Sequence, residues 1–291
     1  MEICEYLRIK RKEIDEALEN CLPKEDAYPP KIHRAMRYSL SNGGKRIRPI
    51  LTLATSQVVG KKAELMKAAC GIELIHSSSL ILDDLPSMDN ANFRRGRPAT
   101  HKVFGEAVAI LAAYGLLMKG LALIAHNCRK AKIDNKVASQ IMEDISEAIG
   151  SCGMIGGQTV DLDSKAMDLK TLEYIHTHKT GKLFVAACET GARLCGASEK
   201  ERQALKNYAG NIGLAYQIRD DILDFEGKRE LTGKDTGKDI NRVSFVTLLG
   251  AEKAKEHAAK LVKSSLYSLK IFAPREKILR QLAEYIVERE N

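Results

Sequence analysis

The sequence predicts a single all-α domain of roughly ten helices. Apolar residues recur at helical spacing along almost the whole chain, and no convincing series of alternating strands interrupts them. No linker or low-complexity run separates two halves of the 291 residues, so we expect one domain spanning 1–291. Hydrophobic residues at 44% and charged residues at 29% suit a globular chain that buries a sizeable core.

The helices are delimited by apolar stripes and by the turn residues between them. Stripes at i, i+3, i+4 spacing lie within 134–150 (Val137, Ile141, Ile145 and Ile149), 201–217 (Leu205, Tyr208, Ala209, Ile212 and Tyr216) and 278–286 (Ile278, Leu282, Tyr285 and Ile286). Glycine and proline mark the breaks between helices. In chain order these breaks fall at Pro23–Pro30, Gly43–Pro49, Gly60, Pro86–Pro98, Gly196 and Gly227–Gly237.

The net charge of +8 does not predict a nucleic-acid partner. Aromatic residues make up 5% of the chain and tryptophan is absent, so platforms for stacking bases are few, and no nucleic-acid motif occurs. The basic residues that stand out form two short clusters, GGKRIRP at 43–49 and RRGRP at 94–98. Clusters this short suit a small polyanion better than a long one.

Cysteine use and hydropathy predict a cytoplasmic protein without a membrane span. The seven cysteines are odd in number, scattered, and lack the CxxC or Cys/His spacing of a zinc site, so we expect reduced thiols. No run of 18 apolar residues occurs, as a spanning helix would require. The charged start, MEICEYLRIKRKEIDEALEN, does not resemble a signal peptide.

The first acidic motif, SLILDDLPSMDN at 79–90, places Asp83 and Asp84 after an apolar run and Asp89 shortly beyond them. Pro86 disfavours helical geometry at the residue before it, so we expect the helix to end or bulge there and Asp89 to return beside Asp83. The competing explanations are a solvated helix end, a calcium loop and chance. The spacing of an EF-hand is missing, which excludes that form of calcium loop.

The second acidic motif, YQIRDDILDFE at 216–226, places Asp220 and Asp224 on one face of a helix, beside Asp221. Like charges on a largely apolar helix are unfavourable unless a cation compensates, and the competing explanation is a solvated edge with Arg219 as local partner. Two such acid sets predict a clamp for a hard cation, Mg²⁺ or Mn²⁺ rather than zinc. A charged loop follows each motif, which suits a pyrophosphate ligand.

Six segments in order resemble the trans-type short-chain polyprenyl diphosphate synthases, from about residue 30 to the C-terminus. They are SNGGKRIRP (41–49), IHSSSLILDDLPSMDNANFRRGRPATHKVFGEAVAILA (75–112), GMIGGQTVDLDS (153–164), HKTGKLF (178–184), YQIRDDILDFEG (216–227) and TGKDTGKD (232–239). Each alone is weak evidence, whereas all six with suitable spacing are highly specific. The resemblance implies antiparallel helices bundled around a deep central cavity, usually as a homodimer, with the two acidic motifs facing each other across its mouth.

The resemblance also implies a reaction: head-to-tail (1'-4) condensation of isopentenyl diphosphate with dimethylallyl, geranyl or farnesyl diphosphate. About three Mg²⁺ ions would be held on the allylic diphosphate by Asp83, Asp84, Asp89, Asp220, Asp221 and Asp224. Arg94, Lys179 and Lys234 would contact the same diphosphate, whereas that of isopentenyl diphosphate would be bound by Lys45, Arg48, His76 and Arg95. Thr180 and Gln217 would stabilise the developing allylic cation. Taken alone, His76 on an apolar helix is more typical of a satisfied core histidine than of a ligand.

Three positions depart from the family pattern. Leu82 stands where the family usually has His, Tyr114 where it has the Asp of a GDALL segment, and Arg242 where it often has Lys. None of these changes removes a predicted metal ligand. Tyr114 is expected to alter the hydrogen bonding around the site or to narrow the pocket.

Product length depends on how deep the cavity runs. Ser78 precedes Asp83 by five residues, at a position where members that stop at C15 usually carry an aromatic residue. A small residue leaves the floor open, so we expect geranylgeranyl diphosphate (C20), with farnesyl diphosphate (C15) as the alternative. A non-catalytic regulatory subunit is disfavoured by the two intact acidic motifs, and a class I terpene cyclase is disfavoured by the GGKRIRP segment.

Overall fold

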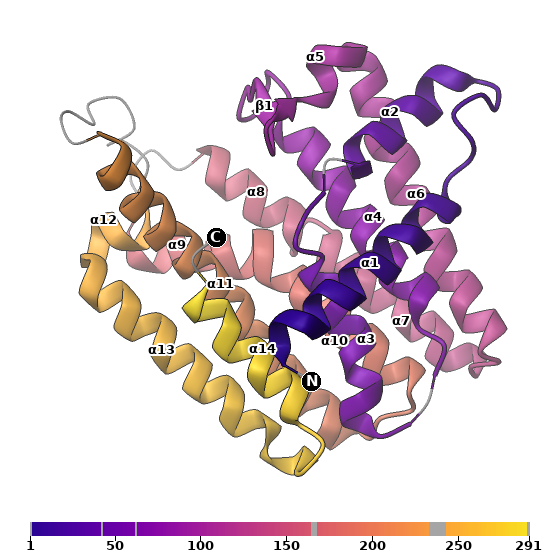
Figure 1. Ribbon diagram of the computed structural model, residues 1–291. Coiled ribbons are helices and arrows are strands. Elements are labelled where there is room, and N and C mark those ends of the chain that lie inside the picture. The colour runs from indigo at the N-terminus through magenta and orange to yellow at the C-terminus, as the bar shows by residue number, and fades with distance from the viewer. Residues whose placement is uncertain (1, 42, 62, 164–167, 233–242, 290–291) are drawn as a thin grey trace. The chain divides into compact units, whose positions relative to one another are not determined.

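The computed structural model describes residues 2–41, 43–61, 63–163, 168–232 and 243–289, and only the backbone of 228–232 (Figure 1). The described residues are helical almost throughout, which confirms the all-α class. The exception among them is a hairpin of two short strands, β1 (Phe93–Arg94) and β2 (Arg97–Pro98). The predicted ligand Lys234 and the departure Arg242 lie outside the described residues, as does most of the TGKDTGKD segment.

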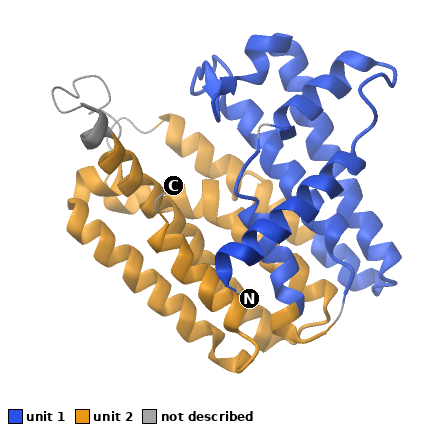
Figure 2. Ribbon diagram, viewed as in Figure 1, with its two compact units in different colours: residues 1–56, 62–142 blue, residues 57–61, 143–291 orange. Residues whose placement is uncertain are grey.

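The chain divides into two compact units (Figure 2). Unit 1 comprises residues 1–56 and 62–142, and unit 2 comprises residues 57–61 and 143–291. The first acidic motif therefore belongs to unit 1 and the second to unit 2. The single domain, its deep central cavity and the meeting of the two motifs across that cavity stay predictions.

Unit 1 is built around α4 (Met66–Asp83), which is apolar on all sides and is accordingly buried over most of its length. It packs against α1 (Ile3–Cys21), α2 (Pro30–Ser41) and, most extensively, α6 (Glu106–Lys130). A β-carbon on Gly71 of α4 would lie 2.6 Å from the Gly120 carbonyl oxygen of α6, and one on Gly120 would lie 2.7 Å from that of Gly71. This close contact fixes the position of α4 along α6, and with it the position of the acidic motif at the end of α4.

The remaining helices of this part of the chain are short or run into unit 2. They are α3 (Ile47–Val59), α5 (Thr100–Phe104) and α7 (Asn135–Ile149). The α5 helix packs against α2 and α6, so it continues the hairpin into the body of unit 1.

One face of α6 is apolar and exposed. The side chains of Leu111, Tyr114 and Met118 are at 59%, 58% and 55% exposure, and Ile110 lies beside them. Their spacing places them in one row along the helix, which we call the α6 stripe (Ile110, Leu111, Tyr114 and Met118). By length and composition alone α6 could cross a membrane, with 39% of its apolar window buried; this is weak evidence, because core helices of soluble proteins pass the same test.

Unit 2 is organised by α11 (Glu199–Thr232), the helix that carries the second acidic motif. Helices α10 (Lys182–Leu194), α13 (Ala251–Ser268) and α14 (Lys277–Glu288) pack against it. A core cluster joins Leu214, Ile218 and Ile222 of α11 to Phe245 and Val246 of α12 (Phe245–Leu249) and to two alanines of α13. The other elements are α8 (Met154–Asp163), α9 (Leu169–Ile175), the π-helical turn His176–Gly181 and the 3-10 turn Leu269–Phe272.

The predicted apolar stripes correspond to α7, α11 and α14, which confirms these helices. The break predicted at Gly227–Gly237 is wrong at its start, because α11 runs through Gly227 to Thr232. A glycine inside a helix costs only about 1 kcal/mol relative to alanine, so neighbouring residues can carry the helix past it.

Candidate functional site

The first acidic motif follows the end of α4. The helix ends at Asp83, and the backbone N–H of the C-cap Asp84 bonds the Leu80 carbonyl oxygen at 3.2 Å. The chain then turns back, and the Asp89 N–H donates to the Asp83 carbonyl oxygen at 3.0 Å. This confirms that the helix ends before Pro86 and that Asp89 returns beside Asp83.

Asp84 is buried and holds Arg94 inside unit 1. Its carboxylate accepts hydrogen bonds from Nε of Arg94 at 3.0 and 3.2 Å and a further bond from Nη2. Burial lowers the pKa of the Arg94 guanidinium, but the hydrogen bond to Asp84 and the charges of Asp84, Asp83 and Asp89 outweigh it and raise the pKa above its ordinary value. All three acids of the motif therefore lie around one arginine.

The β1–β2 hairpin brings the two basic clusters together. Its turn consists of Arg95 and Gly96, with φ of 53° and 76°. Positive φ at both central residues is the geometry of a type I′ turn, and Arg95 adopts it although it is not a glycine. Nη1 of Arg95 donates to the carbonyl oxygen of Gly43, so the RRGRP cluster is attached to the GGKRIRP loop.

His76 of α4 lies among the arginines of unit 1. Its Nε2 is 3.2 Å from Nη1 of Arg48. Burial, followed by the positive charges of Arg48, Arg95, Arg46 and Arg94, lowers the pKa of His76 well below its ordinary value. His76 is therefore neutral near pH 7, and its Nε2 accepts the hydrogen bond from Arg48, because a guanidinium can only donate. The structure thus gathers three predicted diphosphate ligands, Arg48, His76 and Arg95, with Arg94.

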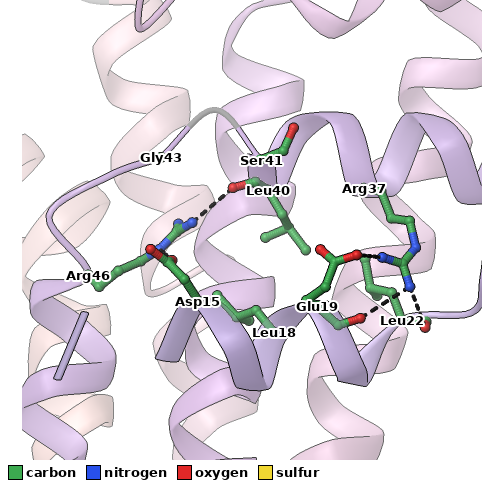
Figure 3. Close-up of a pocket in the computed structure, with 9 residues that line it drawn as sticks. All are labelled: Asp15, Leu18, Glu19, Leu22, Arg37, Leu40, Ser41, Gly43 and Arg46. Carbon is green, nitrogen blue, oxygen red and sulfur yellow. Dashed lines mark hydrogen bonds and ion pairs between the residues drawn. The ribbon is translucent and has the colours of Figure 1, made fainter. Parts of the chain in front are cut away.

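Arg46 has a structural role although it belongs to the same basic cluster. It is buried and donates to Asp15 at 2.7 Å, to Glu73 at 2.6 Å and to the Leu40 carbonyl oxygen at 2.8 Å. Arg46 lines a cavity of about 200 Å³ together with residues of α1, α2 and the loop between α2 and α3. Figure 3 shows Arg46 at one end of this group of lining residues. Arg46 thereby anchors the loop in which the predicted ligand Lys45, partly buried, precedes it.

In unit 2, Lys179 and Thr180 lie in the π-helical turn His176–Gly181. Such turns are rare and occur frequently at functional sites. A β-carbon on Gly157 of α8 would lie 2.3 Å from the Lys179 backbone nitrogen, so only glycine allows α8 to approach the turn this closely. Nζ of Lys179 donates to Oδ2 of Asp161 at 2.7 Å, so an acid of α8 holds this predicted ligand.

The structure also brings Thr180 and Gln217 together. Oγ1 of Thr180 is 3.4 Å from Oε1 of Gln217 on α11. Gln217 shares a helix face with Asp220, Asp221 and Asp224, which follow it by three, four and seven residues. The π-helical turn therefore reaches the face of α11 that carries the second acidic motif.

Two acids of the second motif are hydrogen bonded by groups outside it. Asp220 accepts from Nη2 of Arg289 at 2.7 Å, and Asp221 accepts from the Phe245 N–H at 2.9 Å. Arg289 also donates to the Tyr216 carbonyl oxygen at 3.0 Å, and its guanidinium lies 4.0 Å from the centre of the Tyr216 ring. The end of the described chain therefore contributes directly to the second motif.

Sequence reasoning missed Arg289 and Asp161. Arg219, the local partner considered for the second motif, lies 3.7 Å from the carboxylate of Glu226 within the motif and also donates to the Arg289 carbonyl oxygen at 3.0 and 2.7 Å. Asp161 lies within the segment GMIGGQTVDLDS, so its place in a family motif was a usable signal. Nothing in the local sequence marks Arg289, because its partners lie far away along the chain.

The donor set of both motifs suits a hard divalent cation. All six side chains supply carboxylate oxygens, the ligands that Mg²⁺ and Mn²⁺ prefer. Within the part of the chain that the structure describes, no group of three or more His, Cys, Asp or Glu side chains has the arrangement of a ready-made metal site. The acids fit Mg²⁺ by their chemistry, and their convergence on shared ions stays a prediction.

Comparison with known proteins identifies the family. The pattern of the family described as Polyprenyl synthetase matches residues 29–285. Geranylgeranyl pyrophosphate synthase 4 of Arabidopsis thaliana is 41% identical, over 98% of this chain and 78% of that protein. Farnesyl diphosphate synthase of Geobacillus stearothermophilus is 43% identical, over 88% of this chain and 87% of that protein.

A solved structure agrees with these relatives. The crystal structure of an FPP/GFPP synthase from Zymomonas mobilis, in its apo form, matches with a TM-score of 0.86 and 34% identity over 98% of both chains. The matches cover most of each protein as well as most of this chain. The chain therefore belongs to the polyprenyl synthetase family and is a prenyltransferase that elongates prenyl diphosphates.

Proposed function

We propose that this enzyme catalyses the head-to-tail (1'-4) condensation of isopentenyl diphosphate with an allylic diphosphate, in a reaction that depends on Mg²⁺. The observation that carries the proposal is the group of arginines that surrounds His76 and the first acidic motif in unit 1. A metal-bound diphosphate needs this combination, because guanidinium groups bind phosphate oxygens and carboxylates bind the ions.

Lys45, Arg48, His76 and Arg95 would bind the diphosphate of isopentenyl diphosphate. Neutral His76 orients Arg48 by accepting its N–H, and the Gly43 carbonyl oxygen fixes Arg95. Side chains already held by hydrogen bonds lose little freedom when the substrate binds, which favours affinity.

Arg94 and Lys179, with Lys234, would contact the allylic diphosphate. Asp84 holds Arg94, and Asp161 holds Lys179. About three Mg²⁺ ions, or Mn²⁺, would be held by Asp83, Asp84, Asp89, Asp220, Asp221 and Asp224, and when bound would neutralise the charge that builds on the departing diphosphate. Arg94 and Lys179 stabilise the same charge from the protein side, as preorganised cations do.

Thr180 and Gln217 would act on the other product of bond cleavage, the allylic cation. Their oxygens lie 3.4 Å apart, and both are uncharged acceptors that can stabilise positive charge without trapping it covalently. The alkene of isopentenyl diphosphate attacks the cation, and the departing diphosphate accepts the proton that is then lost. No nucleophilic residue is required.

We propose geranylgeranyl diphosphate (C20) as the product. Ser78 is buried on α4, about 7.5 Å along the helix axis from Asp83, and a side chain this small would not close a chain-binding cavity below the acidic motif. Tyr114 belongs to the exposed α6 stripe, so its ring is not packed into the core of unit 1. The Arabidopsis and Geobacillus relatives carry C20 and C15 names at similar identity, so product sizing must decide.

The test is to incubate the purified enzyme with Mg²⁺, isopentenyl diphosphate and each of three starters, dimethylallyl, geranyl and farnesyl diphosphate. Chromatography of the dephosphorylated products should show C20 from every starter. Products that stop at C15 would refute the C20 assignment and keep the reaction class, whereas no product would refute both. Ser78→Phe should shorten the product, while Ser79→Ala, one position on, serves as the matched control.

We also propose that the enzyme is a cytoplasmic homodimer assembled through the α6 stripe. Four apolar side chains in one exposed row are what a helix interface between two copies would bury. All seven cysteines, each in the described part of the chain, are thiols, which agrees with a reducing compartment. Sedimentation should give a dimer that Leu111→Glu dissociates, whereas Val103→Glu, an exposed apolar position outside the stripe, should leave it intact. A monomeric wild type would contradict the assembly.

A further inference from the structure

The aromatic side chain of Tyr38 on α2 holds the segment that carries the RRGRP cluster. Its hydroxyl donates a hydrogen bond to the carbonyl oxygen of Pro98 in β2 at 2.8 Å. The guanidinium of Arg97, also in β2, lies 4.6 Å from the centre of the Tyr38 ring, which is a cation–π contact. The ring of Phe104 in α5 meets the Tyr38 ring edge-on, with 5.5 Å between the centres. One side chain of α2 therefore contacts both the second strand of the hairpin and the helix that follows it.

The support that Tyr38 gives to β2 extends to the two arginines proposed as substrate ligands. Arg97 pairs with Arg94 across the hairpin, and Arg95 lies in the turn between them. A hairpin of two strands is marginally stable by itself. A residue other than glycine at positive φ, such as Arg95, persists only where the surrounding contacts hold it. We therefore expect the geometry of the turn to depend on the contacts that Tyr38 makes with β2.

The hairpin also contacts the end of α2 and the loop that follows it. Nη1 of Arg97 donates to the Ser41 hydroxyl oxygen at 3.2 Å. Nη1 of Arg95 donates to the Gly43 carbonyl oxygen. A β-carbon on Gly44 would lie 2.6 Å from the same nitrogen of Arg95, so the loop backbone lies directly against this guanidinium. The hairpin is thus held against the end of α2 at which the GGKRIRP loop begins.

We propose that Tyr38 is a positioning residue for the site that binds the diphosphate of isopentenyl diphosphate. By fixing β2, it keeps the Arg95 guanidinium against the Gly43 carbonyl oxygen and beside the GGKRIRP loop. Tyr38 acts through Arg95 and not on the substrate directly. The inference rests on the proposed function, because it takes Arg95 as a ligand of this diphosphate.

The contacts of the two arginines predict that the two substrates respond differently to the loss of Tyr38. The carboxylate of Asp84, at the end of α4, binds Arg94 through Nε at 3.0 and 3.2 Å and through Nη2. This ion pair involves neither α2 nor β2, so it keeps Arg94 in place for the allylic diphosphate. The Gly43 carbonyl oxygen lies in the loop after α2, so a shift of β2 separates Arg95 from it. Loss of Tyr38 should therefore weaken the binding of isopentenyl diphosphate and leave that of the allylic diphosphate nearly unchanged.

The test is steady-state kinetics of Tyr38→Phe and Tyr38→Leu, with each substrate varied while the other is saturating. Tyr38→Phe keeps the ring and removes only the hydrogen bond to Pro98, so the variant should fold. It should raise the KM of isopentenyl diphosphate about 3-fold to 10-fold, the usual effect of losing one hydrogen bond. Tyr38→Leu also removes the ring, so it should raise this KM further. In both variants kcat and the KM of the allylic substrate should stay within about 2-fold of wild type. Tyr28→Phe, the same exchange at a 93% exposed position of unit 1, is the matched control.

Limited proteolysis with trypsin reports on the hairpin without any substrate. Cleavage after Arg95, in the exposed turn, should be several-fold faster in Tyr38→Leu than in wild type, because the segment opens more often. Other sites should be cut at the wild-type rate, which separates a loosened hairpin from a destabilised unit.

Three results would overturn the role of Tyr38: an unchanged rate of cleavage after Arg95, a wild-type KM for isopentenyl diphosphate, or an equal rise in KM for both substrates. A wild type without activity would refute the proposed function instead. Cleavage after Arg95 would then still decide whether Tyr38 holds the hairpin.

Discussion

The two acidic motifs are held in place by different kinds of contact. In the first motif the partners are local: Asp84 and Arg94 are 10 residues apart, and Asp89 bonds back to Asp83. In the second, Asp220 is held by Arg289, which is 69 residues away. The first motif is therefore a compact segment whose geometry follows from its own sequence, whereas the second is complete only when the end of α14 has packed against α11.

The two ion pairs also differ in which member is buried. In the first pair the side chain of Asp84 is 4% exposed and that of Arg94 is 33% exposed. In the second pair the order is reversed, since Arg289 is 1% exposed and Asp220 is 35% exposed. Losing the more exposed partner would thus leave a buried acid in unit 1 and a buried base in unit 2.

The largest expected effect on activity follows from removing one acid of either motif. Asp83→Asn and Asp224→Asn should each lower kcat/KM by about 10²–10³-fold, because each removes a carboxylate from the proposed cation clamp. Steady-state kinetics over a Mg²⁺ titration would measure this, with the exposed Asp26→Asn as matched control. If kcat/KM falls in only one of the two variants, only the motif changed in that variant acts on the metal.

Stability measurements should separate the two ion pairs. Arg94→Met leaves Asp84 buried without its cation and should lower the free energy of unfolding by about 3–5 kcal/mol. Arg289→Met leaves Asp220 partly in water and should cost only about 1–2 kcal/mol, chiefly from lost hydrogen bonds. Urea unfolding of both variants gives the two values, and the reverse order would contradict the assignment of the buried member.

Unit 2 contains a further ion pair, in which Asp161 positions Lys179. Asp161→Asn removes the charge that holds Nζ of Lys179 at 2.7 Å and should lower kcat about 10-fold to 100-fold, because the ammonium group loses its orientation. Asp163→Asn, the exposed acid at the end of the same helix, is the matched control. If both variants retain wild-type kcat, Asp161 has no positioning role.

A pH series should produce the smallest effect, and it should arise in unit 1. The folded pKa of His76 lies below the unfolded value of 6.5, so the unfolded chain binds more protons between the two values. The contribution of His76 to stability is therefore fully present above about pH 6.5 and is lost as the pH falls below it, by up to about 1.4 kcal/mol per pH unit. His76→Gln should flatten this part of the stability profile measured by urea unfolding. An unchanged profile would show that His76 is not neutral in the folded enzyme.

The sequence was sufficient to predict those features of the structure that follow from neighbouring residues. Pro86 predicted the end of α4 and the return of Asp89, and the apolar stripes predicted α7, α11 and α14. Family resemblance assigned Thr180 and Gln217 to the same allylic cation, and the structure places their side-chain oxygens 3.4 Å apart. These predictions rest on short-range geometry or on a family motif that can be recognised from the order of its residues.

Sequence reasoning failed where a residue acts through tertiary contact. Arg289 looks like an ordinary basic residue near a chain end, and only the packing of α14 on α11 shows that it reaches Asp220. Arg46 and Arg48 are two residues apart in one basic cluster, yet one is held by Asp15 and Glu73 while the other bonds His76. The π-helical turn was also missed, because residue spacing alone does not distinguish one extra residue per turn from an α-helix.

The close packing of Gly71 on α4 against Gly120 on α6 has a consequence for engineering product size. Since neither position admits a side chain, α4 cannot slide along α6 when other residues of the pair are exchanged. Positions on one face of α4 therefore keep constant distances along the helix axis from Asp83. Under the proposed control of product length at Ser78, a bulky side chain placed on that face closer to Asp83 should give a shorter prenyl product, and one placed further away a longer product.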